Sequence, residues 1–184
     1  MNLIDRVKNI LLTPKTEWDV INSETVTPPS LLVSYIFPLA VISAIGPVLS
    51  GFLFPGRLWL NSFLISALFA FLSAIISYYI SLYIIDILAP TFGSEKDLNK
   101  SAQLVAYSTT PSFIAGLLSF IPVIGGLLSF VAWAYSIYIM YLGLTPLKKT
   151  PEDKKIIYLI IAFIVTVAVM MVVSAILGSM LLTS

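Results

Sequence analysis

The chain has 184 residues, of which 59% are hydrophobic and 10% are charged, and its formal net charge is +1. Soluble domains are about a quarter charged, so the composition indicates an integral membrane protein with a single domain. The near-neutral charge gives no electrostatic reason to expect nucleic-acid binding. Cysteine and histidine are both absent, which excludes disulfides, thiol nucleophiles and imidazole bases; we expect no metal site and no cofactor.

Residues 1–30 form the main polar segment of the sequence. Apolar side chains recur at helical spacing over the first eleven positions, which predicts a short amphipathic helix lying on the membrane surface. Thr13 and Pro14 resemble an N-cap followed by a first-turn proline. A second short helix carrying Trp18 should therefore follow and end at Pro28. Because the first long apolar run begins only after this cytoplasmic segment, we expect no cleavable signal peptide.

Residues 31–184 are predicted to form a transmembrane domain of five helices. A helical crossing needs about 20 apolar residues, and the block from Leu104 to Leu144 has no charged residue and is long enough for two crossings. We expect this block to fold as a hairpin that reverses at Pro122, Gly125 and Gly126, where a turn has little steric cost. The predicted fold is an all-α polytopic membrane bundle with spans at about 31–53, 58–89, 104–120, 123–144 and 156–182.

The distribution of basic residues predicts the orientation of the bundle. With a cytoplasmic N-terminus, five spans leave Arg57 on the outer side and the other nine of the ten lysines and arginines on the inner side. This bias follows the positive-inside rule and places the C-terminus outside. A single crossing of residues 104–144 would instead move the four-lysine loop at 148–155 to the outer side, so the charge distribution supports the hairpin.

Small side chains recur along the predicted second span. They lie three or four positions apart, at Ser62, Ser66, Ala70, Ala74, Ser77 and Ser81. Such a stripe lets another helix approach closely in lipid. We expect this helix to be central and expect the chain to pack with itself or with another membrane protein.

Pro111 predicts a bend in the third span, because proline cannot donate to the carbonyl four residues earlier, that of Tyr107. In lipid this carbonyl has no water to bond, but the hydroxyls of Ser108, Thr109 and Thr110 lie within one turn. We therefore expect one of these hydroxyls to satisfy it. Tyr107, Thr109, Thr110 and Pro111 are candidate functional residues.

The fourth span carries several aromatic residues. Trp133 or Tyr141 is expected in the aromatic belt at the membrane interface, although a cavity lining is the alternative. Tyr135 and Tyr138 should lie deeper in the membrane. They are candidates for interhelical hydrogen bonds to the hydroxyls at positions 108 and 109.

Asp86 is the only ionisable residue within an apolar span, which makes it a functional candidate. Tyr79 and Tyr83 precede it at helical spacing, so the three could form a polar path or a binding site. The alternative is a structural aspartate near the cytoplasmic headgroups. A carboxylate in the last helical turn opposes the helix dipole, so we expect a cationic partner, Lys96 or Lys100.

The two inner loops carry helix-start signals. Ser94 and Asp97 stand at capping-box-like spacing, so the third helix is expected to begin near Glu95. In the second loop, Thr150 and Pro151 resemble an N-cap and first-turn proline for the last helix.

These features resemble the Yip domain family of five-helix membrane proteins, whose eukaryotic members interact with Rab/Ypt GTPases of the early secretory pathway. The resemblance covers essentially the whole chain. It rests on Pro14-Lys-Thr-Glu-Trp18-Asp-Val-Ile21, on Ala106-Tyr107-Ser-Thr-Thr-Pro111, and on Pro122 to Gly126 leading to Trp133, Tyr135, Ser136, Leu142 and Gly143. The short N-terminal segment is similar to the prokaryotic branch, which implies a prokaryotic cell membrane. The acidic and tyrosine-containing motifs of eukaryotic members are not evident, so the resemblance gives little support for GTPase binding.

Two functions remain open at this point. The first is a non-enzymatic membrane protein that acts through helix packing, with itself or with membrane partners, in membrane organisation or a trafficking-like role. The alternative is a small ion or solute channel or transporter that uses Asp86 and its neighbouring tyrosines. An intramembrane enzyme is disfavoured, because one membrane aspartate without His or Cys cannot supply a paired-carboxylate or nucleophile-base arrangement.

Overall fold

The computed structural model describes residues 2–53, 60–121 and 123–182, and the regular elements in these ranges are helical. The all-α prediction is confirmed. The α-helices, in chain order, are α1 (Leu3–Leu12), α2 (Pro14–Ser23), α3 (Pro28–Leu31), α4 (Phe37–Leu53), α5 (Leu60–Leu88), α6 (Leu98–Ser108), α7 (Thr110–Leu117), α8 (Ile124–Lys148) and α9 (Lys155–Leu182). A π-helical segment, Leu32–Ile36, joins α3 to α4, and 3-10 turns occupy Ala89–Phe92 and Leu118–Phe120.

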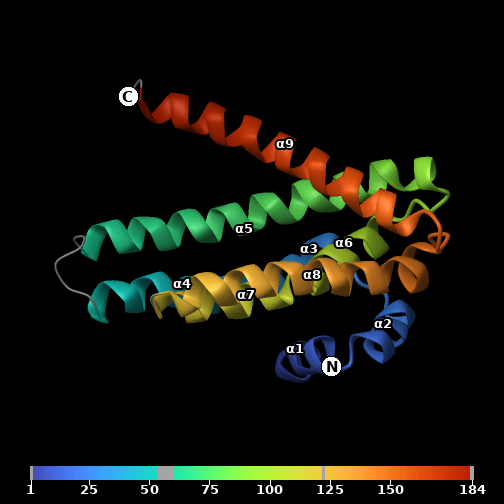
Figure 1. The fold of residues 1–184 in the computed structure, drawn as a ribbon, viewed down its shortest axis with the longest axis horizontal. Coiled ribbons are helices and arrows are strands. Elements are labelled where there is room, and N and C mark those ends of the chain that lie inside the picture. The colour runs from blue at the N-terminus through green and yellow to red at the C-terminus, as the bar shows by residue number, and fades with distance from the viewer. Residues whose placement is uncertain (1, 54–59, 122, 183–184) are drawn as a thin grey trace.

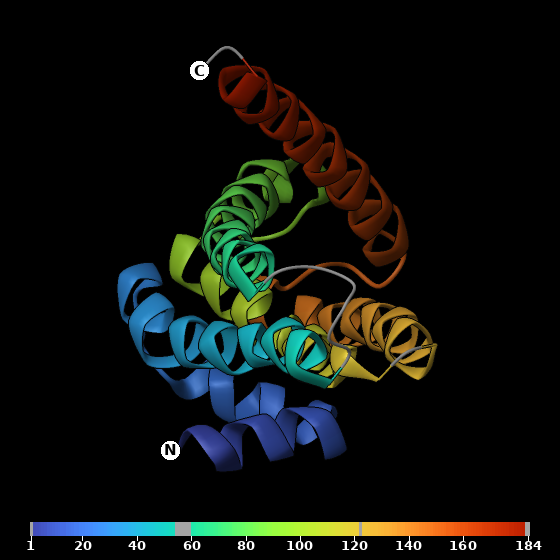
Figure 2. The ribbon, with the colours of Figure 1, turned by 90° about the vertical axis from the view of Figure 1, so that its left-hand side faces the viewer.

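The long helices form an elongated bundle in which α5 contacts α4, α6 and α9, as expected for a central helix. Helices α1 and α2 lie on one side of the bundle, where α2 packs on α8 (Figure 2). Helix α9 lies on the opposite side and diverges from α5 toward its C-terminus (Figure 1). The loops at 93–97 and 149–154 meet at one end of the bundle, where the Glu95 amide donates to the carbonyl of Lys148 at 2.8 Å.

Four helical stretches in the described ranges are long and apolar enough to cross a membrane: Pro28–Leu53, Leu68–Phe92, Ile124–Lys148 and Lys155–Val172. They correspond to the first, second, fourth and fifth predicted spans. The remaining predicted span, 104–120, falls on α6 and α7, which are each shorter than a crossing and are separated at Thr109. Helices α6 and α7 both pack against α8, so the hairpin is present but its first arm is broken.

The reversal between α7 and α8 differs from the expected glycine turn. Val123 has the left-handed φ of 66°, whereas Gly125 and Gly126 lie inside the first turns of α8. A Cβ on Gly125 would lie 3.1 Å from the backbone of Ser119, so this glycine permits close packing. A Cβ on Gly126 would meet nothing within 4 Å. Pro122, the other predicted turn residue, lies outside the described residues.

The N-terminal prolines have different roles from each other. Thr13 and Pro14 open α2 as expected, although the Thr13 hydroxyl donates to Asn9 and does not cap the helix. Helix α2 ends at Ser23, before the prolines at 28 and 29. Pro28 begins α3 behind a capping box at Thr27, so the prediction that it terminates α2 is wrong. The reason is that proline is tolerated in a first helical turn, where its missing N–H needs no partner.

Both predicted helix starts in the inner loops are also displaced. Asp97, not Ser94, caps α6 by accepting from two backbone amides, and the Ser94 hydroxyl instead donates to Thr150. Thr150 donates in turn to the carbonyl of Leu144 and does not cap α9, which begins at Lys155. Because the two hydroxyls bond across the interface between the loops, neither is free to cap the helix that follows it.

The buried core is continuous from the N-terminal segment into the bundle, since Ile10, Trp18 and Ile21 belong to the same apolar cluster as the long helices. The apolar face of α1 therefore packs on protein. Ile4 and Leu12 point outward and are 71% and 70% exposed.

Helices α4 and α7 approach each other closely. A Cβ on Gly46 would lie 2.1 Å from the carbonyl oxygen of Gly116, so these backbones are nearly in contact. This contact does not involve the predicted stripe of small residues on α5. The first two serines of that stripe, at 62 and 66, lie outside the residues whose side chains are described. Glycine therefore permits the close contact between α4 and α7.

Candidate functional site

Three helices bring charged and polar side chains together at the end of the bundle where the loops at 93–97 and 149–154 meet. Lys148, the last residue of α8, places its Nζ 3.2 Å from Asp86 Oδ1 on α5 and 2.7 Å from the hydroxyl of Ser101 on α6. The Ser101 hydroxyl also lies 3.0 Å from the same carboxylate oxygen. We call these residues the three-helix cluster.

The three-helix cluster is shielded from solvent by its surroundings. Lys148 is 0% exposed and Asp86 is 5% exposed. A buried charge is tolerated when it is paired and hydrogen-bonded, and here the ammonium also donates to the carbonyl of Asp97 at 3.2 Å. Tyr158 of α9 covers the adjacent turn of α5, where its hydroxyl donates to the carbonyl of Ile85. The cluster therefore fixes how α5, α6 and α8 meet.

The partner of Asp86 differs from the expected one. We expected Lys96 or Lys100, but Lys100 donates to the carbonyl of Asn22 at 2.6 Å. Burial lowers the pKa of Lys100 although Asp97 acts in the opposite direction. Lys148 takes its place because α8 continues through residues that the sequence placed in a loop. No pattern in the sequence distinguishes Lys148 from the neighbouring Lys149, which pairs with Glu95 in solvent.

The two tyrosines predicted to accompany Asp86 point elsewhere. Tyr83 is 49% exposed, and Tyr79 packs edge-on against Tyr78 with a centroid distance of 5.2 Å. The tyrosine missed by the sequence is Tyr78, whose buried hydroxyl donates to the carbonyl of Pro28 at 3.1 Å. Asp86 therefore faces a lysine and a serine, and the predicted path of Asp86 with its two tyrosines is not assembled.

A second buried ionic group joins the N-terminal helices. Arg6 of α1 bonds Glu17 of α2 at 2.5 Å and also bonds Glu24, and both Arg6 and Glu17 are 4% exposed. Asn9 donates to the second oxygen of Glu17 at 3.1 Å. The guanidinium lies 5.2 Å from the ring centroid of Tyr107 on α6, within the range of a cation–π contact. We call these residues the N-terminal cluster.

Trp18 joins α2 to α8. The residue is fully buried, and its indole N–H donates to the carbonyl of Ile139 at 3.0 Å. One turn further along α8, a Cβ on Gly143 would lie 2.7 Å from the indole ring and 2.6 Å from the side chain of Leu104. The ring therefore occupies space that only glycine leaves open. Sequence reasoning singled out both motif residues but did not predict that they meet.

The break between α6 and α7 confirms the expected behaviour of Pro111. The hydroxyl of Thr110 donates at 2.7 Å to the carbonyl of Tyr107, the group that Pro111 leaves without a backbone donor. Thr109 donates to the carbonyl of Ala106 at 3.0 Å. The Thr110 oxygen also lies 2.7 Å from the hydroxyl of Tyr35, which ties the break to the π-helical segment that precedes α4.

The tyrosines of α8 are placed differently from each other. Tyr135 makes a hydrogen bond between helices, but its hydroxyl donates to the carbonyl of Leu11 on α1 at 2.7 Å, so the predicted partners at positions 108 and 109 are wrong. Tyr138 stacks on Tyr135 at a centroid distance of 5.9 Å and is 45% exposed. The prediction that Trp133 or Tyr141 lies in an aromatic belt stays a prediction.

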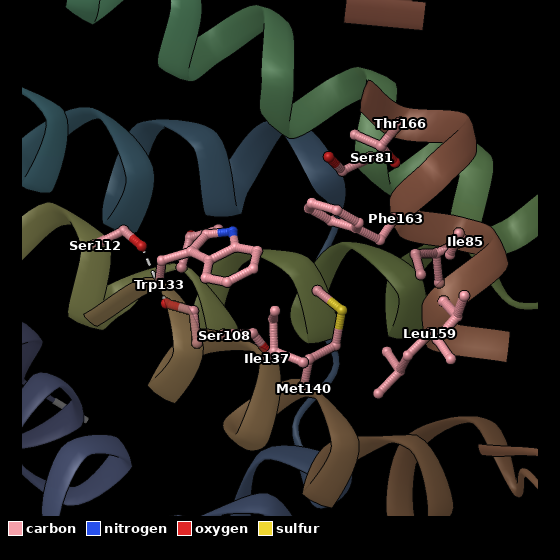
Figure 3. Close-up of a pocket in the computed structure, with 14 residues that line it drawn as sticks. Ser81, Ile85, Ser108, Ser112, Trp133, Ile137, Met140, Leu159, Phe163 and Thr166 are labelled. Carbon is pink, nitrogen blue, oxygen red and sulfur yellow. Dashed lines mark hydrogen bonds between the residues drawn. The ribbon is translucent and has the colours of Figure 1, made fainter. Parts of the chain in front are cut away.

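A cavity of about 350 Å³ lies between α5, α8 and α9, with the α6–α7 break at its base (Figure 3). Most of its walls are apolar, and six hydroxyl-bearing residues also line it: Ser81, Ser108, Thr109, Ser112, Ser136 and Thr166. Ser112 and Ser136 bond each other at 3.1 Å. The Ser108 oxygen is buried and has no hydrogen-bond partner among the residues that the structure describes. We call this cavity the hydroxyl groove.

Long apolar helices that enclose paired charges define an integral, polytopic helical membrane protein. Across the described ranges, no three Asp or Glu side chains gather as metal ligands would. The family model described as the Yip1 domain matches residues 8–174. The chain therefore belongs to the Yip1 domain family, and the resemblance in its motifs is confirmed. No curated protein and no solved structure matches it significantly.

Proposed function

We propose that this Yip1 domain protein is a non-enzymatic, five-span scaffold that packs with itself or with another membrane protein and thereby organises the membrane. One observation carries the proposal. The charged groups of both buried ionic clusters are paired within the chain, so they hold its helices together. A bundle held together in this way has a rigid shape and a lipid-facing surface that is available for packing.

The path of the chain supports five spans. Helix α5 ends, α6 begins and α8 ends at the end of the bundle that carries the inner loops, whereas α8 begins at the opposite end (Figure 1). The α6–α7 unit must therefore traverse the bundle as one broken span. Its polar first half, in which residues 101–108 are buried, is enclosed by protein, which is where irregular or polar helix is tolerated at membrane depth.

The arrangement of the charged segments supports a cytoplasmic N-terminus and an outer C-terminus. The two lysine-containing loops meet through the ion pair of Lys149 with Glu95, at 2.6 Å. The N-terminal segment joins the same end through Lys100 and the carbonyl of Asn22. The two loops and the C-terminal end of α2 thus lie at one end of the bundle, as the positive-inside rule requires of cytoplasmic segments. Reporters fused at Met1 and at Ser184 should give signals on opposite sides of the membrane.

Helix α9 is the helix best placed to meet a partner. It lies at the edge of the bundle, where its main contact is with α5. Its outward side chains Ile156, Ile160 and Ile164 are 63%, 52% and 58% exposed. In lipid, helices associate by packing such faces against each other.

Crosslinking from α9 tests the scaffold proposal. The chain has no cysteine, so Ile160→Cys gives one attachment point for a thiol-linked photocrosslinker in native membranes. We expect a discrete adduct at twice the chain mass or at a reproducible higher mass. Ala162→Cys is the matched control, because Ala162 lies on the same helix and is 3% exposed. Monomer alone from both variants would count against the proposal.

The transport alternative makes a different prediction. A transport carboxylate must exchange partners, whereas Asp86 is buried and is held by Lys148 and Ser101. We therefore expect purified protein in liposomes to move no ion or small solute. A flux that Asp86→Asn abolishes while the fold is kept would replace the scaffold proposal by the transport one.

A further inference from the structure

We propose that α1 lies in the headgroup layer of the membrane leaflet on the side of the loops at 93–97 and 149–154, and that one flank of this helix binds the acyl chains of that leaflet. The flank consists of Leu3, Ile4, Val7 and Leu11, and we call it the lipid flank. The partner is therefore a lipid surface. This inference goes beyond the scaffold proposal, which concerns α9, and does not depend on it.

The first observation is the place of α1 on the bundle. The long helices run along the bundle in Figure 1, whereas α1 runs across it, as the view down the bundle in Figure 2 shows. A helix that lies across a membrane-spanning bundle is roughly parallel to the membrane plane. The hydrogen bond from Tyr135 to the carbonyl of Leu11 joins α1 to the middle of α8. Lys148, the last residue of α8, is about 20 Å further along that helix at 1.5 Å per residue, so α1 lies beside the bundle and not beyond its end.

The second observation is that α1 has two different flanks beside the face that packs on protein. The polar flank is turned toward α2, since Asn9 donates to Glu17. Helix α2 in turn leads toward the end of the bundle where the two loops meet, because the carbonyl of Asn22 accepts from Lys100. With 3.6 residues per turn, the lipid flank lies on the side of α1 opposite Asp5 and Asn9. It therefore points along the bundle toward the membrane interior.

The lipid flank is only part of the apolar face that the sequence predicted to contact lipid. Ile10, in the middle of that face, is 0% exposed and belongs to the core. Leu3, Val7 and Leu11 are partly buried against the core, and Ile4 is 71% exposed. Protein therefore takes the centre of the apolar face, and the edge away from α2 is left for the acyl chains.

Size and charge decide between lipid and a protein as the occupant. Helix α1 has 10 residues and is about 15 Å long, so a flank about 10 Å wide offers on the order of 150 Å². A stable protein interface buries about 800 Å² on each partner, which is several times more. The exposed charges of α1, Asp5 and Lys8, are opposite in sign. Apolar contact and not net charge therefore selects the occupant, and acyl chains meet that requirement on a small area.

The consequence is a fixed depth for the bundle in the membrane. Helix α5 has 29 residues and is about 43 Å long, whereas the hydrocarbon layer is about 30 Å thick. Apolar length alone therefore leaves the bundle free to move by several ångströms along the membrane normal. Helix α1 is fixed to α6 through Arg6 and to α8 through Tyr135. Because its lipid flank is also held in one leaflet, α1 removes this freedom.

Spin-label depth measurements test the proposal. The chain has no cysteine, so Ile4→Cys and Asp5→Cys each give one labelling site on the full chain in phosphatidylcholine vesicles. We expect the label at position 4 to lie about 5–10 Å below the lipid phosphates and to be accessible to oxygen. The label at position 5 should lie at the phosphates and be accessible to a water-soluble nickel complex. Lys149→Cys and Ile164→Cys, at exposed positions of a loop and of α9, are the aqueous and membrane references.

Two matched substitutions separate the lipid flank from the rest of the exposed surface of α1. Ile4 and Leu12 are 71% and 70% exposed, but Leu12 lies on the side of Asp5. In vesicles, Ile4→Asp should place a carboxylate among the acyl chains and raise hydrogen exchange over residues 3–12 several-fold. Leu12→Asp should leave the exchange nearly unchanged. The helix dipole acts in the opposite direction, because it favours an acid in the first turn and opposes one in the last. A larger effect at Ile4 therefore reports the lipid contact.

Four results would overturn the proposal. Equal access of the nickel complex to the labels at positions 4 and 5 would place α1 in water. Protection of both labels from oxygen and from nickel would mean that a protein covers α1. A depth at position 4 that required added phosphatidylserine would replace apolar contact by attraction between charges. Equal exchange in Ile4→Asp and Leu12→Asp would mean that the two flanks do not differ. The α9 crosslinking measures another surface, so this proposal and the scaffold proposal can fail separately.

Discussion

The two buried ionic clusters use the same chemistry at very different sequence distances. In the N-terminal cluster, Arg6 reaches acids 11 and 18 positions away. In the three-helix cluster, Lys148 reaches Asp86 and Ser101 across 62 and 47 positions. The N-terminal cluster holds α1 and α2 together and against α6. The second sets how three long helices meet. Similar burial therefore predicts different consequences when each cation is removed.

Lys148→Met is expected to have the largest effect. It leaves the Asp86 carboxylate buried without a cation, which typically costs about 3–5 kcal/mol. The apparent midpoint of thermal unfolding in mild detergent should fall sharply. Lys149→Met is the matched control, because the adjacent lysine is 71% exposed at its side chain and pairs in solvent. The double variant with Asp86→Leu should recover much of the loss. Equal midpoints for the two lysine variants would refute the role of the three-helix cluster.

Arg6→Met should have a comparable local cost but a smaller effect on the bundle. Glu17 would lose its buried cation, and α1 would lose its ionic link to α2 and its contact with Tyr107 of α6, so the N-terminal helices would be held less firmly. Hydrogen exchange should rise over residues 3–23 and remain low in the described part of α5. Lys8→Met provides the control, because Lys8 lies on the exposed face of α1. If exchange rose equally throughout the bundle, the N-terminal segment would be part of the same cooperative unit as the long helices.

Gly143→Ala sharpens the comparison at the contact where α2 meets α8. The added methyl group would lie within 3 Å of Trp18 and Leu104, and overpacking of this kind costs about 1–3 kcal/mol. Gly126→Ala is a matched control on the same helix, where a Cβ meets nothing within 4 Å. That control should be neutral or stabilising by about 0.5–1 kcal/mol, because alanine favours helix interiors. We therefore expect Gly143→Ala to lower the midpoint of thermal unfolding and Gly126→Ala to leave it unchanged or raise it.

Features with local causes could be predicted from the sequence. Pro111 and Thr110 lie within one turn of the carbonyl they affect, so the break and its hydrogen bond followed from spacing alone. The apolar runs likewise gave four of the five expected spans as long helices. The third required tertiary context, because polar residues such as Ser101 and Gln103 are buried by neighbouring helices and not by a continuous apolar sequence.

Long-range partners could not be predicted, because they depend on how each helix is rotated and how far it extends. Lys148 and Lys149 are neighbouring residues of the same type, yet Lys148 is buried and Lys149 is exposed. Gly125 and Gly126 suggested a turn, but the positive φ falls on Val123. The meeting of Trp18 with Gly143 spans most of the chain. The sequence shows only a tryptophan in a polar segment and a lone glycine in an apolar helix. Neither feature indicates which residue it contacts.

Thr110→Val tests the break between α6 and α7. The carbonyl of Tyr107 would lose its donor and Tyr35 its partner, and a buried unsatisfied group costs about 1–3 kcal/mol. Ser108→Ala is the informative comparison, because the Ser108 hydroxyl bonds none of the residues that the structure describes. This variant should leave the unfolding midpoint nearly unchanged. A larger loss for Ser108→Ala than for Thr110→Val would mean that the hydrogen bonds at the break are assigned to the wrong hydroxyls.

Glu152→Gln should have the smallest effect and should depend on pH. Hydrogen bonds from Lys155 and Thr145 hold the pKa of the Glu152 carboxyl below its ordinary value of 4.5. A lowered pKa means that the folded state favours the ionised carboxylate. This contribution is therefore complete above pH 4.5 and is lost as the pH falls through the lower folded value. The variant should unfold slightly earlier than the unmodified chain at pH 7 and should match it at acidic pH. Because Glu152 is exposed, high salt should also remove the difference at pH 7.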